Sequence, residues 1–153
     1  MGYGAVAVEG DSMEALDYGV LTTPASLPLT SRLLMLFQGL IDLIDRLQPT
    51  DAAVEQLFFA RNVQSALAVG QARGVALLAA ASRGIPVSEY TPLQVKQAVA
   101  GYGRATKDQV QNMVQLMLGL GEVPQPDDAA DALAIAICHA RWDENTGGGR
   151  ASL

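Results

Sequence analysis

The 153-residue chain is poor in the residues that build many active sites, with one cysteine, one histidine and one tryptophan. The single cysteine, Cys138, excludes an internal disulfide and suits a reducing compartment. With one histidine and one cysteine, the sequence has no Cys/His zinc spacing, and a nucleophile–base triad is not expected. There is no Gly-x-x-x-x-Gly-Lys phosphate loop, and Gly2-Tyr-Gly4 is too short for a dinucleotide fingerprint.

Long apolar stretches are also scarce, and from this scarcity we expect no membrane-spanning segment. Residues 1–15 lack the basic start and apolar stretch of a signal peptide, so we expect a cytoplasmic protein. Half of the residues are apolar and 17% are charged, which is typical of a globular chain. The length suits one domain, expected over residues 1–142, with a flexible tail over 143–153 that holds the run Gly147–Gly149.

The net charge of −6 is unevenly distributed. The segment 61–107 has six basic residues and one acid, a net charge of +5, and the remainder has four basic residues and fifteen acids. Either the cations are scattered surface residues, or they form a basic face beside an acidic site, as in proteins that bind nucleic acid. The six basic residues are Arg61, Arg73, Arg83, Lys96, Arg104 and Lys107.

Apolar periodicity and helix-capping patterns predict an α/β domain with a mixed sheet. Leu33, Phe37 and Leu40 repeat at helical steps after a start at Thr30 or Ser31. The predicted strands are 4–9, 16–22, 52–55 and 86–90. The predicted helices are 30–48, 61–83, 92–100, 106–118 and 127–142.

Three carboxylates are candidates for a divalent-metal site. Asp128 and Asp131 lie three residues apart on a predicted helix and therefore point the same way. Such a pair repels unless a cation joins the two groups, and oxygen ligands favour Mg²⁺ or Mn²⁺. Glu55 ends the strand 52–55, where α/β folds place their ligands. The alternatives are a helix cap with a dipole-favoured acid, and an ordinary strand-end acid.

Aromatic residues directly follow this glutamate. Phe58 and Phe59 pack in a core or, alternatively, stack on an unpaired base of a nucleic acid. His139 lies eight residues beyond Asp131, roughly 12 Å along the helix, which is too far to share a metal ligand shell. We expect His139 to be a structural or surface residue.

Four sequence blocks stand out together, namely 54–58, 70–76, 94–99 with Gly101 and Gly103, and 128–136. In order and spacing, from about Gly2 to about His139, the chain resembles bacterial RuvC, the Holliday-junction resolvase family. The resemblance implies a ribonuclease-H-like fold, with a mixed central sheet flanked by helices. It also implies a homodimer that binds a four-way DNA junction and nicks two opposed strands.

The same resemblance implies roles for single residues. Glu55, Asp128 and Asp131 match three of the family's four metal-binding carboxylates, which implies two Mg²⁺ ions per site, with Mn²⁺ as an alternative. Phe58 matches an aromatic residue that stacks on bases, and the helix 61–83 matches the helix that pairs in the dimer. Lysines 96 and 107 match residues that approach the scissile backbone, and we count Lys107 as catalytic. We add Arg61 and Arg73 of the basic segment to the DNA-binding residues.

The family begins with an apolar strand and a Gly-Ile-Asp-Pro-Gly turn that carries its first catalytic aspartate, and this chain begins after that turn. We therefore expect that the reading frame continues upstream of Met1; a stop codon just before Met1 would contradict this. The implied function is the resolution of Holliday junctions in recombination and repair, with 5′-phosphate nicks and RuvA and RuvB as partners. The alternatives are a non-catalytic junction-binding dimer and a ribonuclease-H-like nuclease that acts on RNA.

Overall fold

The computed structural model describes residues 1–56 and 62–145. The predicted order of strands and helices is confirmed, with ends that differ by a few residues. In chain order the elements are β1 (Gly2–Glu9), β2 (Ser12–Val20), α1 (Leu29–Leu47), β3 (Ala52–Glu55), α2 (Val63–Ser82), β4 (Val87–Tyr90), α3 (Pro92–Ala100), α4 (Lys107–Met117) and α5 (Asp127–Asn145).

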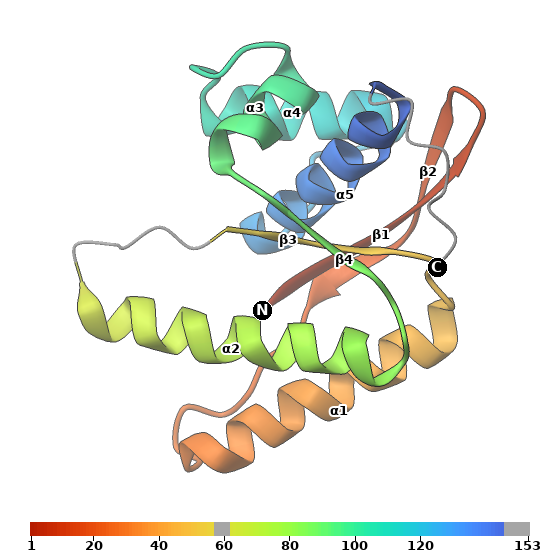
Figure 1. Ribbon diagram of the computed structural model, residues 1–153. Coiled ribbons are helices and arrows are strands. Elements are labelled where there is room, and N and C mark those ends of the chain that lie inside the picture. Colours follow the sequence, from red (N-terminus) through yellow and green to blue (C-terminus); the bar gives the residue numbers. More distant parts are fainter. Residues whose placement is uncertain (57–61, 146–153) are drawn as a thin grey trace.

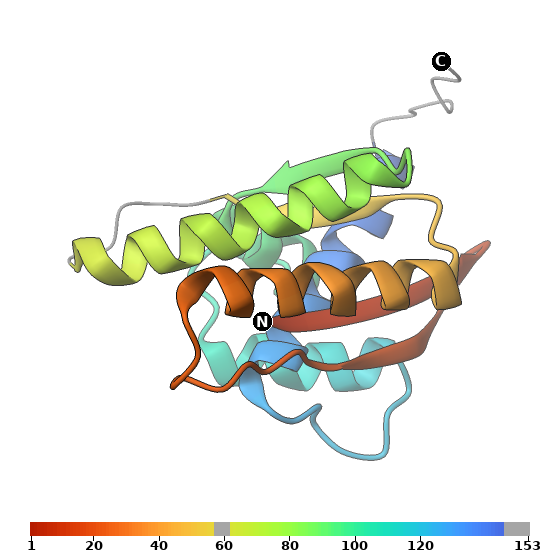
Figure 2. The same ribbon diagram turned by 90° about the horizontal axis from the view of Figure 1, so that it is seen from below.

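The strands form a middle layer between two groups of helices (Figure 1). Helices α3, α4 and α5 lie on one side of the strands, and α1 and α2 lie on the other. Helix α5 contacts all four strands, and α1 packs against α2. Viewed from below, α1 and α2 run side by side across the face of the strands (Figure 2). Helix α5 thus holds together strands that are distant in the sequence.

The four strands form two ladders that are not joined to each other. Strands β1 and β2 pair antiparallel with a register shift between Ala5 and Val6, and β3 and β4 pair parallel. Among residues 1–56 and 62–145, β1 has β2 as its only partner, and β3 has β4 as its only partner. The strand directions are mixed as predicted, and one edge of β1 and one edge of β3 have no neighbouring strand within the described part of the chain.

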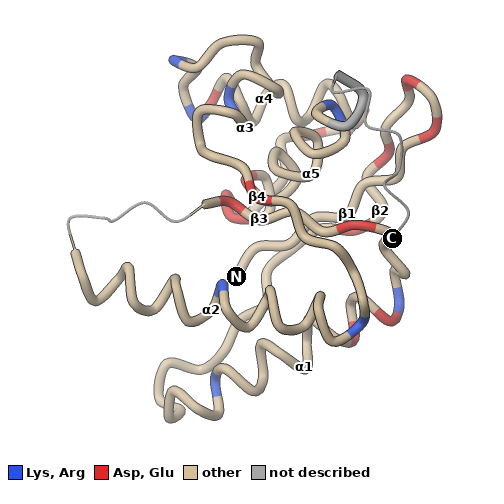
Figure 3. The backbone as a smooth tube through the Cα atoms, viewed as in Figure 1, with Lys and Arg blue, Asp and Glu red and all other residues tan. Residues whose placement is uncertain are grey.

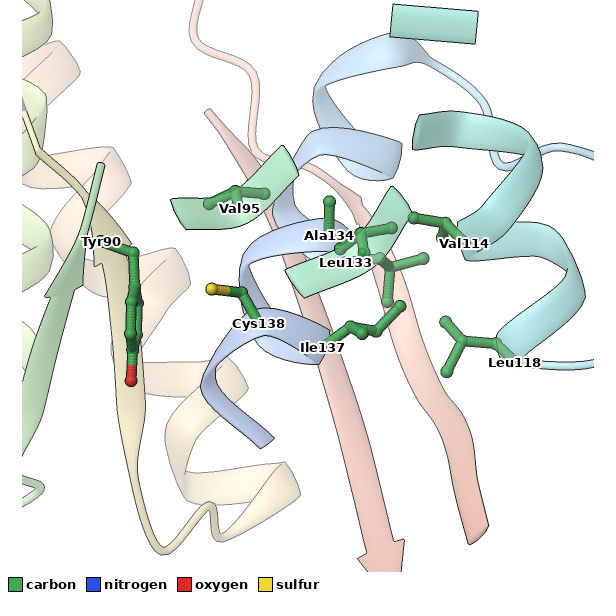
Figure 4. Packing of buried hydrophobic residues seen from close by; sticks show 9 residues of the cluster. Tyr90, Val95, Val114, Leu118, Leu133, Ala134, Ile137 and Cys138 are labelled. Atoms are coloured by element: carbon green, nitrogen blue, oxygen red, sulfur yellow. The ribbon is translucent and has the colours of Figure 1, made fainter. Parts of the chain in front are cut away.

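The hydrophobic core lies between α3, α4, α5 and the end of β4 (Figure 4). Its largest fully buried side chains include Leu133 and Ile137 of α5, Val99 of α3 and Val114 of α4. Cys138 is also fully buried, as expected for a small apolar residue. No residue of α1 is fully buried, so its apolar face contributes less to the core than its helical periodicity predicts.

Helix capping explains most of the boundaries. Thr91 and Thr106 cap α3 and α4 with complete capping boxes. The predicted caps of α1, Thr30 and Ser31, are wrong because the helix already begins at Leu29 after Pro28. The prediction that α2 begins at residue 61 is also wrong, because Asn62 caps a helix whose first residue is Val63.

Two glycines let β1 approach α5 closely. A Cβ atom on Gly2 would lie 2.1 Å from the backbone oxygen of Asp128, and one on Gly4 would lie 2.8 Å from Cδ2 of Leu133. Real Cβ atoms do not come so close to other heavy atoms. Because Gly2 and Gly4 carry no side chain, the first turns of α5 can lie directly against β1.

Helix α2 bears on the expectation that the chain has no membrane-spanning segment. Its residues Val63–Ser82 are long and apolar enough to cross a bilayer by length and composition, and Arg73 is their one charged residue. The sequence argument missed this because the helix owes its apolar character to many alanines rather than to a run of large residues. Helix α5 extends to Asn145, past the predicted end at 142, and residues 146–153 lie outside the described part of the chain.

Candidate functional site

Two of the predicted metal ligands line a pocket of about 250 Å³. Glu55 contributes from the last residue of β3, and Asp131 contributes from the second turn of α5. Lysines from α3 and α4 also line the pocket. The lining residues are Glu55, Pro92, Val95, Lys96, Lys107, Val110, Asp131, Ala134 and Ile135.

The pKa values of both carboxylates of this pocket are raised above their ordinary values. Partial burial, and then the negative charge of Asp131, raise the pKa of Glu55, and Lys96 opposes this shift. Partial burial also raises the pKa of Asp131, and Lys107 opposes that shift. A bound cation would relieve the repulsion between the two carboxylates, whereas the pocket lysines relieve it in part.

Lys107 is held by two carboxylates from the start of α5. Its Nζ atom lies 3.3 Å from Oδ2 of Asp127 and 3.5 Å from Oδ2 of Asp131. Asp127 also accepts a hydrogen bond of 3.2 Å from Nε2 of the buried Gln111. The bond with Asp127 is the main cause that raises the pKa of Lys107. The lysine therefore stays charged beside Asp131 at any working pH.

Asp128, the third predicted ligand, does not line the pocket. It lies in the first turn of α5, where its backbone packs against Gly2. Within residues 1–56 and 62–145, no three His, Cys, Asp or Glu side chains come together in a group that could hold a metal ion. The structure thus brings Glu55 and Asp131 together without Asp128.

The remaining predicted site residues lie in three different situations. Lys96 lines the pocket from α3. Arg73 of α2 forms an ion pair of 2.6 Å with Glu89 and donates a hydrogen bond of 3.4 Å from Nε to the backbone oxygen of Glu55. Phe58 and Arg61 lie outside the described residues.

The donor set of the pocket fits a hard divalent cation. Mg²⁺ is commonly held by one or two carboxylates together with water and substrate phosphate oxygens, so Glu55 and Asp131 suffice for one such site. The pocket has no histidine or cysteine in its lining, which disfavours softer metals. Lys96 and Lys107 suit a phosphate group that would sit beside the cation.

Cations and acids gather on this side of the molecule. Figure 3 shows Lys and Arg on α3, α4 and their connection, close to acidic residues of β3 and α5. Two cations of the basic segment are already paired with acids, because Arg83 forms an ion pair with Asp45 and Arg73 forms one with Glu89. Of the two alternatives for this segment, the basic face beside an acidic site therefore holds only for Lys96 and Lys107, which line the pocket.

Sequence reasoning missed two residues that organise this site. Residue 127 was predicted only as the start of the helix 127–142, but the carboxylate of Asp127 forms an ion pair with Lys107 and accepts a hydrogen bond from Gln111. Glu89 was not singled out, although it is the one acid within the basic segment 61–107. That isolation was the available signal, because a lone acid among cations is often an ion-pair partner.

The chain is similar to known proteins over most of its length. The family described as crossover junction endodeoxyribonuclease RuvC matches residues 1–139. The protein of that name from Chloroflexus aggregans is 64% identical over 140 residues, which cover 92% of this chain and 85% of the relative. That from Desulforamulus reducens is 57% identical over 147 residues, which cover 96% of this chain and 90% of the relative.

Solved structures agree with the fold as well. The chain of T. thermophilus RuvC in complex with Holliday junction substrate superposes with a TM-score of 0.90 at 40% identity, over 95% of this chain and 88% of that chain. A second structure of Thermus thermophilus RuvC gives a TM-score of 0.87 at 42% identity, over 95% and 89% of the two chains. The expected ribonuclease-H-like arrangement is confirmed, and the chain belongs to the RuvC family of crossover junction endodeoxyribonucleases, which are metal-dependent nucleases.

Proposed function

We propose that this protein resolves four-way (Holliday) DNA junctions by metal-dependent hydrolysis of two opposed phosphodiester bonds. The observation that carries the proposal is the convergence of Glu55 and Asp131 with Lys96 and Lys107 in one pocket. Acids that bind a cation and lysines that bind phosphate are the two requirements of a phosphodiesterase site. The relative from T. thermophilus binds a Holliday junction.

The carboxylates of Glu55 and Asp131 would hold Mg²⁺, or Mn²⁺ in its place, and we propose two ions per site with Asp128 as a further ligand. When bound, such ions activate water as a nucleophile and offset the negative charge of the phosphodiester. Asp128 lies one helical turn from Asp131, and its negative charge contributes to the raised pKa of Asp131.

The lysines stabilise the charge that grows during cleavage. Attack on phosphorus by water breaks the bond to the 3′ oxygen and leaves a 3′ hydroxyl and a 5′ phosphate. Lys107 stays protonated because Asp127 and Asp131 raise its pKa, so its ammonium group remains available to the phosphate oxygens. Lys96 lines the pocket from α3, and its positive charge lowers the pKa of Glu55. It would hold the backbone of the same DNA strand. Phe58 and Arg61 are proposed as further DNA contacts.

Helix α2 is proposed as the contact surface of a homodimer. Val63, Leu67 and Leu78 are 70%, 61% and 60% exposed, a large apolar surface for one helix. A Cβ atom on Gly74 would meet nothing within 4 Å, so a second helix can approach there. Two identical sites related by a twofold axis match the symmetry of a four-way junction.

The dimer proposal is tested by analytical ultracentrifugation of the chain and of Leu67→Glu. We expect the unchanged chain to sediment as a dimer and the variant as a monomer. Dimers of equal strength in both proteins would exclude α2 as the contact. Flotation of the unchanged chain with lipid vesicles would instead mean that α2 associates with a membrane.

The activity is tested with a labelled four-way DNA junction in the presence of Mg²⁺. We expect symmetric nicks with 5′-phosphate ends, and we expect Glu55→Gln to abolish the nicks but to keep junction binding. Binding without any nicks from the unchanged chain would favour the non-catalytic junction-binding protein. Cleavage of structured RNA in preference to the junction would favour the RNA nuclease. A version with an apolar strand ahead of Met1, able to pair with the free edges of β1 and β3, is assayed in parallel.

The cellular setting follows from the same proposal. A junction resolvase acts on DNA in the bacterial cytoplasm, during recombination and repair. RuvA and RuvB are the proposed partners, and co-purification of this chain with them on a four-way junction is the direct test.

A further inference from the structure

We propose that Arg73 is a positioning residue that holds the metal ligand Glu55 in place, rather than a residue that binds DNA. The inference rests on the proposed metal-dependent function of the pocket. It concerns a side chain of α2, a helix that does not line the pocket.

The pairing of β3 with β4 decides which side of the strands each residue faces. Glu55 lies opposite Tyr90 and Val54 lies opposite Glu89 in the parallel register. Neighbouring residues of a strand point to opposite faces, so Glu55 and Tyr90 share one face and Glu89 points to the other. Tyr90 packs against α5, which identifies the first face as the pocket side.

Arg73 reaches the strands from the face opposite the pocket. Its guanidinium forms the 2.6 Å ion pair with Glu89, whose side chain points towards α2. The side chain of Arg73 is only 21% exposed, and its charge is balanced by this partner. A cation that is largely covered and already paired is poorly placed to bind a phosphate backbone.

The same guanidinium also contacts the residue that carries the metal-binding group. Arg73 Nε donates to the backbone oxygen of Glu55 at 3.4 Å, at the last residue of β3. The next amide, that of Gln56, donates to the backbone oxygen of Tyr90 at 2.8 Å. The carbonyl and the N–H of one peptide group point in opposite directions, so the Glu55 carbonyl points away from β4 while the Gln56 amide points towards it, and Arg73 supplies the partner of that carbonyl.

Arg73 therefore ties the end of β3 to α2 and, through Glu89, to β4. The edge of β3 that faces away from β4 has no strand partner among the described residues, and β3 ends at Glu55. Loss of Arg73 would therefore leave the end of β3 without a hydrogen-bond donor on that edge. A ligand at a frayed strand end loses its fixed orientation, and partners that orient metal ligands typically contribute 10- to 100-fold to metal affinity or activity.

The first test measures Mn²⁺ binding without DNA, by electron paramagnetic resonance, for Arg73→Gln, Glu89→Gln and the double variant. We expect each single variant to weaken Mn²⁺ binding by about tenfold. The double variant should bind Mn²⁺ no more weakly than either single variant, because all three variants break the same Arg73–Glu89 ion pair. Arg83→Gln is the matched control, because Arg83 belongs to the C-terminal cap of the same helix and pairs with Asp45 away from the pocket.

The second measurement is junction affinity in EDTA over a range of salt concentrations. A positioning role predicts that Arg73→Gln and Glu89→Gln both stay within twofold of the unchanged chain. A direct phosphate contact by Arg73 predicts weaker binding and a salt slope smaller by about one for Arg73→Gln. Glu89→Gln would then bind as tightly or more tightly, and that pair of results would overturn the proposal.

A third readout needs neither metal nor activity, namely titration of the Glu55 carboxyl by ¹³C NMR in EDTA. If Arg73 fixes Glu55 in its partly buried position, Arg73→Gln releases the carboxyl towards water and lowers its pKa. If Arg73 acts only through its charge, the same change raises that pKa, which would contradict the proposal. Should the unchanged chain bind no Mn²⁺, a lowered pKa in both single variants would sustain the positioning role while the proposed function fails.

Discussion

The hydroxyl of Tyr90, the last residue of β4, lies 2.8 Å from Nδ1 of His139 on α5. Their ring centroids are 5.8 Å apart, and Trp142 meets Tyr90 edge-on at 6.0 Å. This contact joins the β3–β4 ladder to the helix that also covers β1 and β2. It gives the single histidine a structural role two turns away from the pocket residue Asp131.

We expect Tyr90→Phe to lower the free energy of unfolding by about 1 kcal/mol, because it removes a largely buried hydrogen bond and keeps the ring. Urea denaturation followed by circular dichroism measures the change. Tyr102→Phe is the matched control, since the hydroxyl of Tyr102 bonds Gln109 at an exposed position and should contribute little. Equal stability of Tyr90→Phe and the unchanged chain would contradict a structural role for this pair.

Cys138 should be inert towards thiol reagents while the protein is folded. Its side chain is fully buried, and burial raises the pKa of the thiol to about 11. At pH 8 roughly one thiol in a thousand would then be ionised, and only the thiolate reacts. We expect labelling by a disulfide reagent to follow the rate of unfolding. Rapid labelling in native buffer would show that the helix α5 opens locally.

The glycines of β1 should be intolerant of even one methyl group. In Gly4→Ala the new Cβ atom would lie 2.8 Å from Leu133 Cδ2 and 3.0 Å from the backbone nitrogen of Leu133. Overpacking of this kind costs roughly 1–3 kcal/mol, and we expect a loss of that size in the free energy of unfolding. Gly121→Ala is the control, since a Cβ atom there meets nothing within 4 Å. A stable Gly4→Ala would mean that α5 moves freely over β1.

The sequence predicted local structure well because its signals are local. Thr91 and Thr106 each carry a glutamine three residues later, and both form the capping boxes that this spacing predicts. Glu55 could be placed at a strand end for the same reason, from the short apolar run before it.

What the sequence could not supply depends on contacts between distant segments. The partnership of Arg73 with Glu89, and that of Lys107 with Asp127, each join residues of different elements, and no spacing rule connects them. That Asp131 lines the pocket and Asp128 does not depends on how β3, α3 and α4 pack around α5. Such packing follows from the tertiary arrangement and not from helical periodicity, which places Asp128 and Asp131 alike.

Removal of the Lys107 charge should move the pH dependence of cleavage. Lys107 lowers the pKa of Asp131, so in Lys107→Gln that pKa rises further above its ordinary value. The acid limb of the cleavage profile, where Asp131 must lose its proton to bind a cation, should shift to higher pH. Lower activity at every pH without a shift would mean that Lys107 acts on the substrate alone.

Loss of the Glu55 charge should stabilise the metal-free protein near neutral pH. Burial and the charge of Asp131 raise the native pKa of Glu55, so the native state keeps a proton at pH values where the unfolded chain has released it. Stability therefore falls as the pH rises through that range, and Glu55→Gln escapes this loss. We expect the melting temperature of Glu55→Gln in EDTA to exceed that of the unchanged chain at pH 7 but not at pH 4.

Added Mn²⁺ should reverse this order at pH 7, because a ligand that binds only the native state raises its stability and Glu55→Gln has lost one carboxylate of the site. Glu122→Gln, a change outside the pocket, controls for the altered net charge of the chain. A Glu55→Gln variant that melts below the unchanged chain in EDTA at pH 7 would show that Glu55 stabilises the fold through contacts of its own. In that case the charge of Glu55 would not lower the stability of the metal-free protein, and the pocket would not be a site in which stability is given up for cation binding.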